Sequence, residues 1–455
     1  MKKSRPVVGV FGHYGNRNLG DESIIEAAIA QIRRRLPNAE ICCFSLRPDD
    51  SARRHRVESY RIGYAPDGFG PITPEQAAAS DSMPWHVYEE KLAKGLDPDN
   101  YSLDPSAAGL KERVKRLPLI GGGVKVLIAA VHRVRDAANE LGYLTTSYTY
   151  LKKFDLLVVA GSNQFLDNFG GPWHFPYTLF KWTLLAKLTG TRIAFVSVGA
   201  NPLEHALSKR MIRGALRLAD YISYRDEASK SLIEAGNTGF SGEVYPDLAF
   251  GLEYQRISPK KSRFRPLVGI NPMPVYDYRY WCVSDDDQYH AYVFKVARFA
   301  ERLIEADYPV LFFGTMWFDD YVIVDILQEM NPEIADRAIE SPLVRRCEEV
   351  SELIQLLQDT DIVVATRFHG AVLPLLVQTP VLGIGYYRKN HDLMSAFGQS
   401  DYYEVLERFD VDRLWEKLLA LSRNCPQEKK AIKLKAAEYR QLTEEQWDRI
   451  VGLIV

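Results

Sequence analysis

At the start of the chain, short apolar runs alternate with amphipathic helical segments, as they do in a parallel α/β fold. The apolar run from Val7 to Phe11 is short enough for a buried strand, and Glu40 to Phe44 repeats this character. Between them, apolar residues recur at helical spacing from Asp21 to Leu36. Because a strand, a helix and a second strand in this order form a βαβ unit, the pattern predicts a mostly parallel sheet.

The same alternation continues along the chain, with two interruptions. It stops between residues 65 and 150, which we interpret as an insertion, and again at the basic run 256–263, which is typical of an interdomain linker. The further strands that we expect are residues 155–160, 192–198, 221–224, 243–246, 267–270, 310–313, 362–365 and 381–385, and the later helices are 288–306, 349–358, one from Arg367 onward and those at about 410–455.

The interruptions divide the chain into two parts of similar design. With 455 residues it exceeds what one hydrophobic core normally serves. We therefore expect an α/β fold with two doubly wound, Rossmann-like domains, residues 1–258 with the insertion at about 65–150, and residues 264–455 with terminal helices. Two such domains facing one another place a ligand cleft between the carboxyl ends of their strands.

Composition narrows the class of protein. The hydrophobic fraction of 46% and the charged fraction of 25% are those of a globular chain. A net charge of -2 gives no global field for nucleic acid, so an anionic ligand must be met by locally placed cations. Five cysteines and nine histidines show no metal-ligand spacing, and we expect neither a metal nor a cofactor. Without a signal-peptide core or a membrane-spanning run, we expect a cytoplasmic protein.

A glycine-rich segment from Gly12 to Glu22 separates the first strand from its helix. Glycines there allow tight turns and a close approach to a ligand, although the spacing matches neither a dinucleotide fingerprint nor a P-loop. Asp21 and Glu22 fall in the first helical turn. They could complement the helix dipole, or they could orient or deprotonate an acceptor hydroxyl.

Cationic residues follow two of the later predicted strands. Arg225 follows the strand 221–224 and could hold a phosphate or carboxylate, or simply pair with Asp226. After the strand 362–365, Arg367 and His369 stand at the start of a helix, and Lys389 follows the next strand. Cations at a helix N-terminus form an anion site, which favours a functional role for this group.

These segments together resemble the polysaccharide pyruvyltransferase family over most of the chain. The matching motifs are Asn18-Leu19-Gly20-Asp21, Tyr224-Arg225-Asp226, Pro246-Asp247 and Arg367-Phe368-His369-Gly370. The resemblance implies a fold similar to the GT-B glycosyltransferases and a phosphoenolpyruvate co-substrate, whose pyruvyl group is transferred to sugar hydroxyls as a ketal. The first domain would then hold the acceptor and the second domain the donor.

The resemblance also assigns roles. Arg225, Arg367 and Lys389 would bind the phosphate and carboxylate of phosphoenolpyruvate, with His369 as general acid. From its place in the first helical turn, we also expect Asp21 to be a catalytic residue that acts on the acceptor hydroxyl. Where the family usually has a run of glycines, this chain has Gly161 to Phe165. The residues that we expect to line the cleft on the acceptor side are Asn18, Gly20, Glu22, Ser162, Asn163, Gln164 and Asn201.

Two other functions stay open at this point. A nucleotide-sugar glycosyltransferase of the same architecture often carries a glutamate in the helix after Arg367, and residues 367–379 contain no carboxylate. A binding protein that keeps the fold without catalysis is the other alternative. The basic segments of the insertion, 111–116 and 132–135, could form a solvated lid or a peripheral membrane contact that receives a lipid-linked glycan.

Overall fold

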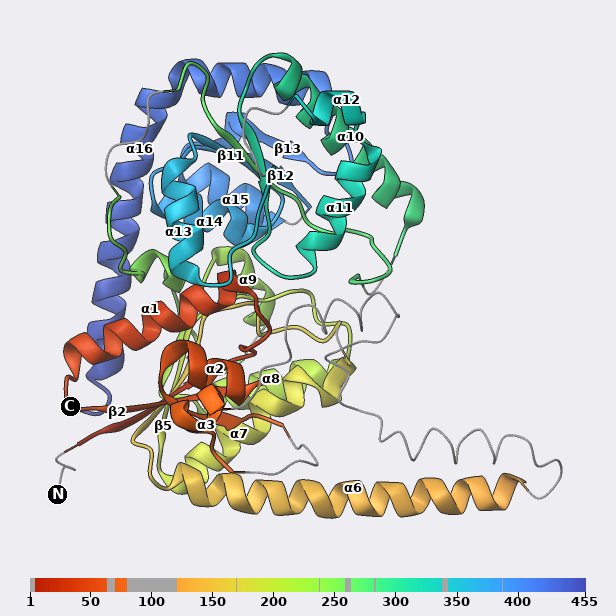
Figure 1. The fold of residues 1–455 in the computed structure, drawn as a ribbon. Helices are drawn as coiled ribbons and strands as arrows, with labels where there is room; N and C mark the ends of the chain where they lie inside the picture. Colours follow the sequence, from red (N-terminus) through yellow and green to blue (C-terminus); the bar gives the residue numbers. More distant parts are fainter. Residues whose placement is uncertain are drawn as a thin grey trace.

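Two parallel β-sheets form the framework of the chain, each covered by helices on both faces (Figure 1). The computed structural model describes residues 5–63, 70–79, 121–168, 170–236, 238–257, 263–281, 284–337, 343–386 and 388–455. The strands of the first sheet end at Val244 and those of the second begin at Val268. Of the expected linker 256–263, residues 258–262 lie outside the described residues, and the expected domain boundary falls within them.

The first sheet has the strand order β3-β2-β1-β4-β5-β6-β7, with every neighbouring pair parallel. Its strands are β1 (Val7–Phe11), β2 (Glu40–Ser45), β3 (Glu58–Arg61), β4 (Leu156–Ala160), β5 (Arg192–Val198), β6 (Tyr221–Tyr224) and β7 (Glu243–Val244). The helices of this half are α1 (Leu19–Arg35), α2 (Pro48–His55), α3 (Pro74–Ala79), α6 (Gly121–Leu151), α7 (Phe175–Thr189), α8 (Ala206–Leu218) and α9 (Glu227–Ile233), with the 3-10 turns η1 (Gly171–Trp173) and η2 (Leu248–Gly251).

The second sheet repeats this design with the order β10-β9-β8-β11-β12-β13, also parallel throughout. Its strands are β8 (Val268–Asn271), β9 (Val310–Phe313), β10 (Val344–Arg345), β11 (Ile362–Ala365), β12 (Val381–Gly385) and β13 (Tyr403–Val405). The helices are α10 (Asp286–Glu305), α11 (Asp319–Glu329), α12 (Pro332–Ala335), α13 (Val350–Asp359), α14 (Phe368–Leu376), α15 (Arg388–Ala396) and α16 (Val411–Val451), with the 3-10 turn η3 (Ser400–Tyr402).

Both sheets reverse their strand order at one point, and these points position the functional site. In the first sheet the reversal lies between β1 and β4, and in the second it lies between β8 and β11. At such a switch point the loops after the two strands leave in opposite directions and open a crevice at the carboxyl edge. The loops that begin at Gly12, Gly161 and Thr366 therefore lie where this topology places a ligand crevice.

One apolar cluster crosses from the first domain to the second. It contains Val10 and Ile24 of the first domain together with Ala365 and Leu373 of the second, all buried. Two further clusters cover the outer faces of the two sheets. Since the strands are buried on both faces, they consist of nearly continuous apolar runs rather than alternating ones.

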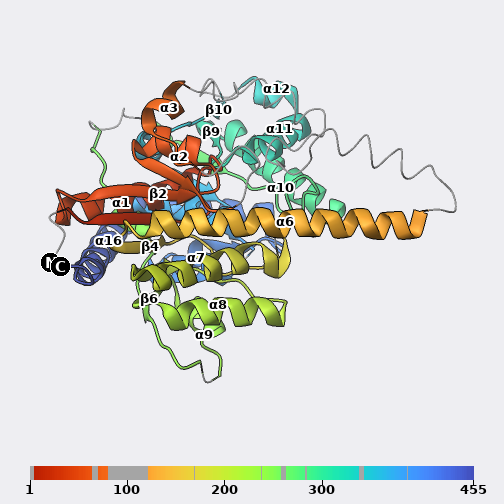
Figure 2. The ribbon, with the colours of Figure 1, turned by 90° about the horizontal axis from the view of Figure 1, so that it is seen from below.

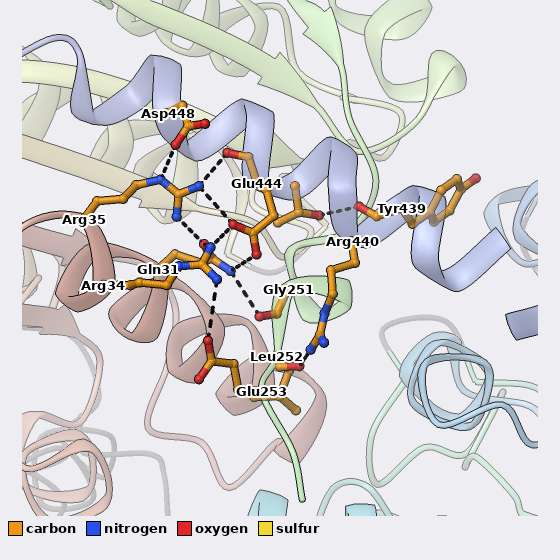
Figure 3. Close-up of polar contacts among 11 residues, drawn as sticks. Gln31, Arg34, Arg35, Gly251, Leu252, Glu253, Tyr439, Arg440, Glu444 and Asp448 are labelled. Atoms are coloured by element: carbon orange, nitrogen blue, oxygen red, sulfur yellow. Dashed lines mark hydrogen bonds and ion pairs between the residues drawn. The ribbon is translucent and has the colours of Figure 1, made fainter. Parts of the chain in front are cut away.

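Helix α16 connects the second domain back to the first. It starts among the core residues of the second domain with Leu414 and Leu418, and its last turns bury Trp447 and Ile450 in the cluster that both domains share. Figure 3 shows its polar contacts with α1, where Arg35 donates to Asp448 Oδ1 at 2.6 Å and to the Glu444 carbonyl at 2.7 Å.

The fold class expected from the sequence is confirmed: two Rossmann-like sheets, each wound on both faces. The strands 7–11, 192–198, 221–224, 310–313, 362–365 and 381–385 have the expected limits. The expected helices at 410–455 are one helix, α16, and the sequence did not indicate β3, β10, β13 or α2.

The segment between residues 65 and 150 lies between β3 and β4. Its described part ends in α6, which runs past the rest of the first domain in both views (Figures 1 and 2). Its final turns pack against α7, where Tyr143 is buried beside Trp182 and Glu140 accepts from Lys181 at 2.8 Å. The basic run 111–116 and the side chains of 132–134 lie outside the described residues. No described helix combines the length and the apolar character needed to span a bilayer.

Candidate active site

The loop after β1 holds Asp21 in a fixed orientation. Asn18 caps α1, accepting from the Gly20 amide at 3.1 Å while its own amide donates to Asp21 Oδ2 at 2.8 Å. The Ser162 hydroxyl, from the loop after β4, donates to Asp21 Oδ1 at 2.8 Å. Asp21 thus lies at the switch point of the first sheet, held by a residue from each of the two loops.

The backbone after β4 is strained to reach this position. Ser162 has a φ of 55°, in the left-handed region that side chains other than glycine seldom adopt. The preceding residue, Gly161, is also left-handed, and a Cβ there would lie 2.8 Å from Ile24. Such strain is typical of functional sites, and here it directs the Ser162 hydroxyl to Asp21.

Asp21 faces His369 of the second domain. A Cβ on Gly20 would stand 2.4 Å from Cγ and Nδ1 of the His369 ring, so α1 and α14 approach this closely only because residue 20 is glycine. Burial raises the pKa of Asp21, and His369 and the Ser162 hydroxyl offset this only in part. A carboxyl group with a raised pKa beside an imidazole is suited to proton transfer.

Glu22 lies on the other side of the helix. It is fully buried, accepts from the Gly15 amide at 2.9 Å and contacts His55 Nε2 at 2.7 Å. The structure therefore separates the two neighbouring carboxylates. Asp21 enters the site, whereas Glu22 fixes the shape of the glycine-rich loop and is not brought to the cleft.

Arg225 enters the cleft from the carboxyl end of β6. It is 6% exposed, and Nη1 lies 3.4 Å from Asp247 Oδ2. Its Nε and Nη2 are buried and have no hydrogen-bond partner among the described residues; Asp226 Oδ2 is 3.7 Å from Nε. The guanidinium lies over the Phe368 ring, 4.3 Å from its centre. Arg225 therefore does not simply pair with Asp226, because it also contacts Asp247 and keeps donors available in the cleft.

Arg367 occupies the N-cap position of α14. Its Nε donates to Asp319 Oδ1 at 2.5 Å, and Nη2 is buried with no hydrogen-bond partner in the described part of the chain. Asp319 also accepts from the Thr315 and Met316 amides, at 2.9 and 3.1 Å. Burial raises the pKa of Asp319, although Arg367 opposes the shift. Asp319 orients one edge of the guanidinium and leaves the other edge for a ligand.

His369 and Arg225 share one carboxylate although they belong to different domains. His369 Nε2 lies 3.6 Å from Asp247 Oδ2, and Arg225 contacts the same oxygen. Burial by itself raises the pKa of Asp247, but His369 and Arg225 hold it down to about 2. Asp247 therefore stays ionised and positions both Arg225 and His369.

Lys389 is half-buried near the start of α15. Its Nζ lies 5.5 Å from the centre of the Phe368 ring, on which Arg225 also lies. Burial and the nearby Arg225 lower the pKa of Lys389 to about 7, although Asp226, Asp21 and Asp247 act in the other direction. Lys389 is therefore only partly protonated at neutral pH, and an anion beside it would favour its charged form.

Of the other residues expected on the acceptor side, Asn163 borders the site, whereas Gln164 has a structural role. Asn163 Oδ1 and Arg225 Nη2 both approach Gly199, at 2.9 and 2.5 Å from where its Cβ would be, so Asn163 borders the cation group. Gln164 is fully buried and donates to the carbonyls of Ala160 and Gly161, which is a structural role. Asn201 is half-buried after β5, and its amide donates to the Phe165 carbonyl.

Two carboxylates of the site had no assigned role in the sequence analysis. Asp247 was part of a recognised Pro-Asp motif, which was the only signal for it. Asp319 had no signal at all, because its partner Arg367 is 48 positions away. Among the described residues, no group of three His, Cys, Asp or Glu side chains could hold a metal ion.

The fold and the site define a two-domain α/β protein with a cationic crevice at paired switch points. A family model described as polysaccharide pyruvyl transferase matches residues 18–387, which is most of the chain and includes Asp21, Arg225, Asp247, Arg367 and His369, while Lys389 lies two positions beyond the match. The chain belongs to this family.

Several solved structures are similar to this chain at very low sequence identity. UDP-GlcNAc 2-epimerase from Methanocaldococcus jannaschii is 8% identical over 91% of this chain and 92% of its own, with a TM-score of 0.49. The N-terminal domain of trehalose-6-phosphate phosphatase from Candida albicans is 10% identical over 100% and 98%, also at 0.49. MurG from Acinetobacter baumannii is 10% identical over 98% and 99%, at 0.44. No curated protein matches the chain.

Proposed function

We propose that this protein transfers a pyruvyl group from phosphoenolpyruvate to two hydroxyls of a sugar in a glycan or glycan precursor, forming a cyclic ketal. Membership of the pyruvyl transferase family supports the reaction class. The carrying observation is a set of buried nitrogen atoms: Arg225, Arg367 and His369 each have a ring or guanidinium nitrogen without a hydrogen-bond partner among the described residues.

Buried donors without acceptors are costly, at about 1–3 kcal/mol each and more for charged groups. An anionic ligand that accepts from all three would recover this energy. Phosphoenolpyruvate carries a phosphate and a carboxylate, and two arginines can each form a paired hydrogen bond with one of them. Lys389, with its lowered pKa, would add a third positive charge when the donor binds.

The reaction needs one proton to be delivered and two to be removed. Protonation of the donor's terminal alkene carbon makes a methyl group and leaves the central carbon electrophilic. One sugar hydroxyl adds to this carbon and loses its proton, and the second hydroxyl then displaces phosphate from it. The products are the ketal and inorganic phosphate, which leaves with the second hydroxyl proton.

The two catalytic groups stand on opposite sides of the cleft. His369 acts as the general acid towards the alkene carbon, and Asp21 accepts a proton from an attacking hydroxyl. The Gly20 contact brings the ring and the carboxylate together, and Ser162 and Asn18 orient the carboxylate. Arg225 and Arg367 stabilise the charge on the departing phosphate.

We test the proposal by incubating the protein with phosphoenolpyruvate and a panel of glycan acceptors, with phosphate release and product mass as readouts. We expect the His369→Ala variant to keep its fold and lose about 10²–10⁴-fold in rate. The matched control is His290→Ala, an exposed histidine on α10. If phosphoenolpyruvate neither raises the melting temperature nor is consumed with any acceptor, the proposal is wrong.

The proposed acceptor is a sugar or lipid-linked glycan reached from the cytoplasm, in some cases at the inner face of the membrane. The basic segments of residues 65–150 supply the charge for contact with anionic lipid. Flotation of the protein with anionic and neutral liposomes tests the membrane part. If the protein floats with neither kind of liposome, the proposed membrane contact is wrong. The proposed transfer reaction does not depend on this result.

A further inference from the structure

Four aromatic side chains form a continuous row beside Arg367. Phe318 and Tyr280 have ring centres 4.9 Å apart, Tyr280 and Trp281 are 5.9 Å apart, and Trp281 and Tyr386 are 5.4 Å apart. The Tyr280 ring lies 5.3 Å from the Arg367 guanidinium carbon. We name Phe318, Tyr280, Trp281 and Tyr386 the aromatic row.

The aromatic row lies on the crevice side of the second sheet. Tyr280 and Trp281 follow β8, Phe318 follows β9 and Tyr386 follows β12, while Arg367 follows β11 between them. All four side chains stand in loops after parallel strands, so they meet at the carboxyl edge where ligands bind in such sheets. The loop of Phe318 also touches the first domain, because the Leu19 amide donates to the Thr315 carbonyl at 2.8 Å.

The four rings are only half-buried, unlike the core aromatic residues behind them. Tyr292 and Phe409 in the adjacent core are 2% and 1% exposed, whereas each ring of the aromatic row keeps an intermediate exposure. A contiguous patch of half-exposed aromatic surface at the carboxyl edge of a parallel sheet is typical of a ligand-binding site. The donor is too polar for this purpose, since both of its ends are anionic.

We infer that the aromatic row is the subsite for a pyranose ring of the acceptor. This inference rests on the proposed function and specifies how the acceptor is held. A pyranose has an apolar face of C–H groups and a polar rim of hydroxyls. Aromatic faces carry partial negative charge and attract C–H groups, while the rim remains free to meet polar groups at the edge of the row.

The position of the aromatic row relative to Arg367 gives the subsite a role in catalysis. A sugar stacked on Tyr280 and Trp281 has its rim next to the guanidinium that would bind the donor. Two hydroxyls of one ring must reach one carbon, so the ring has to be held in a fixed orientation. The acceptor would therefore rest on the second domain, while Asp21 of the first domain approaches its hydroxyls.

The test uses three variants of the full chain. Trp281→Leu removes the flat ring but keeps apolar volume, Trp281→Phe keeps an aromatic face, and Phe264→Leu is the control because Phe264 is 98% exposed elsewhere in this domain. We expect Trp281→Leu to raise the acceptor KM about tenfold, as the loss of one good stacking contact predicts. We expect the KM for phosphoenolpyruvate to stay unchanged and Trp281→Phe to restore most of the affinity for the acceptor.

A second readout does not depend on phosphoenolpyruvate. Saturation-transfer NMR with methyl glycosides of common hexoses and N-acetylhexosamines reports sugar binding to the intact protein. Glycoside binding that is lost in Trp281→Leu supports the subsite, even if phosphoenolpyruvate is not consumed. A failure to consume phosphoenolpyruvate would instead overturn the proposed function. Transfer with an unchanged acceptor KM in Trp281→Leu overturns the subsite and leaves the function standing. Uridine diphosphate that binds in place of the glycosides also overturns it.

Discussion

Phe368 lets two cations lie close together in the crevice. Arg225 lies over its ring at 4.3 Å, and Lys389 lies 5.5 Å from the ring centre. An aromatic face attracts positive charge, and this partly offsets the repulsion between an arginine and a lysine. Phe368 also starts α14, so it links the position of both cations to the helix that carries His369.

Gly20 offers a test of the contact between the domains. We expect Gly20→Ala to reduce the rate of transfer strongly, because the added methyl group would stand 2.4 Å from the His369 ring and must displace it. The control is Gly142→Ala in α6, where the added Cβ meets nothing within 4 Å. Alanine favours a helix over glycine by about 1 kcal/mol, so the control should keep full activity and equal or greater stability. Equal activity of both variants would contradict the contact.

Lys389 predicts a pH dependence of donor binding. With a pKa of about 7 in the ligand-free protein, Lys389 loses its charge as the pH rises through 7, and an anionic donor then binds less well. We expect the KM for phosphoenolpyruvate to rise between pH 7 and pH 9, by at most tenfold per pH unit. The second phosphate ionisation, near 6, lies below this range and does not confuse the result.

The variant Lys389→Arg separates this effect from others, since arginine stays charged throughout the range. Its KM for phosphoenolpyruvate should be nearly constant from pH 7 to pH 9. If the natural chain and the variant show the same pH dependence, another group is responsible.

At the scale of elements, the central strands were readable from the sequence, whereas the edge strands β3, β10 and β13 were not. Residues 362–365 and 192–198 lie inside a sheet, are buried on both faces and are apolar throughout. In contrast, β3 has the sequence Glu-Ser-Tyr-Arg and β10 has only two residues. Edge strands are short and polar because a long apolar edge would invite aggregation, so their signal is weak.

The sequence predicted only those site residues that directly follow a buried strand. Arg225, Arg367 and His369 could be found because each follows a buried strand. The roles of Asp21 and Glu22 could not be separated, because neighbouring residues on a helix differ by about 100° in direction and the sequence does not give the helix rotation. Asp319 could not be found because its role depends on a contact between loops far apart in the chain.

The end of α16 provides a prediction at this scale. Gln446 is fully buried and donates to the hydroxyls of Ser197 and Ser223 on β5 and β6, at 3.0 and 2.9 Å. We expect Gln446→Leu to lower the free energy of unfolding by about 2 kcal/mol, because two buried hydroxyls lose their donor. Chemical denaturation measures this. The control Gln441→Leu changes an exposed residue of the same helix and should have little effect.

For the whole molecule, the shared apolar cluster and α16 join the domains more firmly than a linker would. Residues of both domains pack in one cluster, and Arg35 and Glu444 tie α1 to α16 (Figure 3). Inter-domain motion is the default expectation when an interface is small and polar. Here the shared apolar cluster restricts motion between the domains, so the crevice is largely formed before a ligand binds.

A protease site placed between Ile257 and Arg263 tests this view of the molecule. After cleavage of the folded protein, we expect the two parts to elute together in gel filtration and to keep their activity. The control adds Trp447→Ala, which removes a buried ring of α16 from the shared cluster. We expect that variant to separate after cleavage. Separation without the substitution would show that the linker alone holds the domains.

Main-chain contacts join the loop after β1 to the loop after β9. Leu19 donates its amide to the Thr315 carbonyl, and Asn18 pairs with Met316 as an antiparallel bridge. Main-chain donors and acceptors are common to nearly all residue types, so the side chains of Leu19, Thr315 and Met316 can drift during evolution while the contact persists. Proline at position 19 is the exception, since it has no amide hydrogen. Related chains could thus diverge widely in sequence here and still bring the same two catalytic groups together.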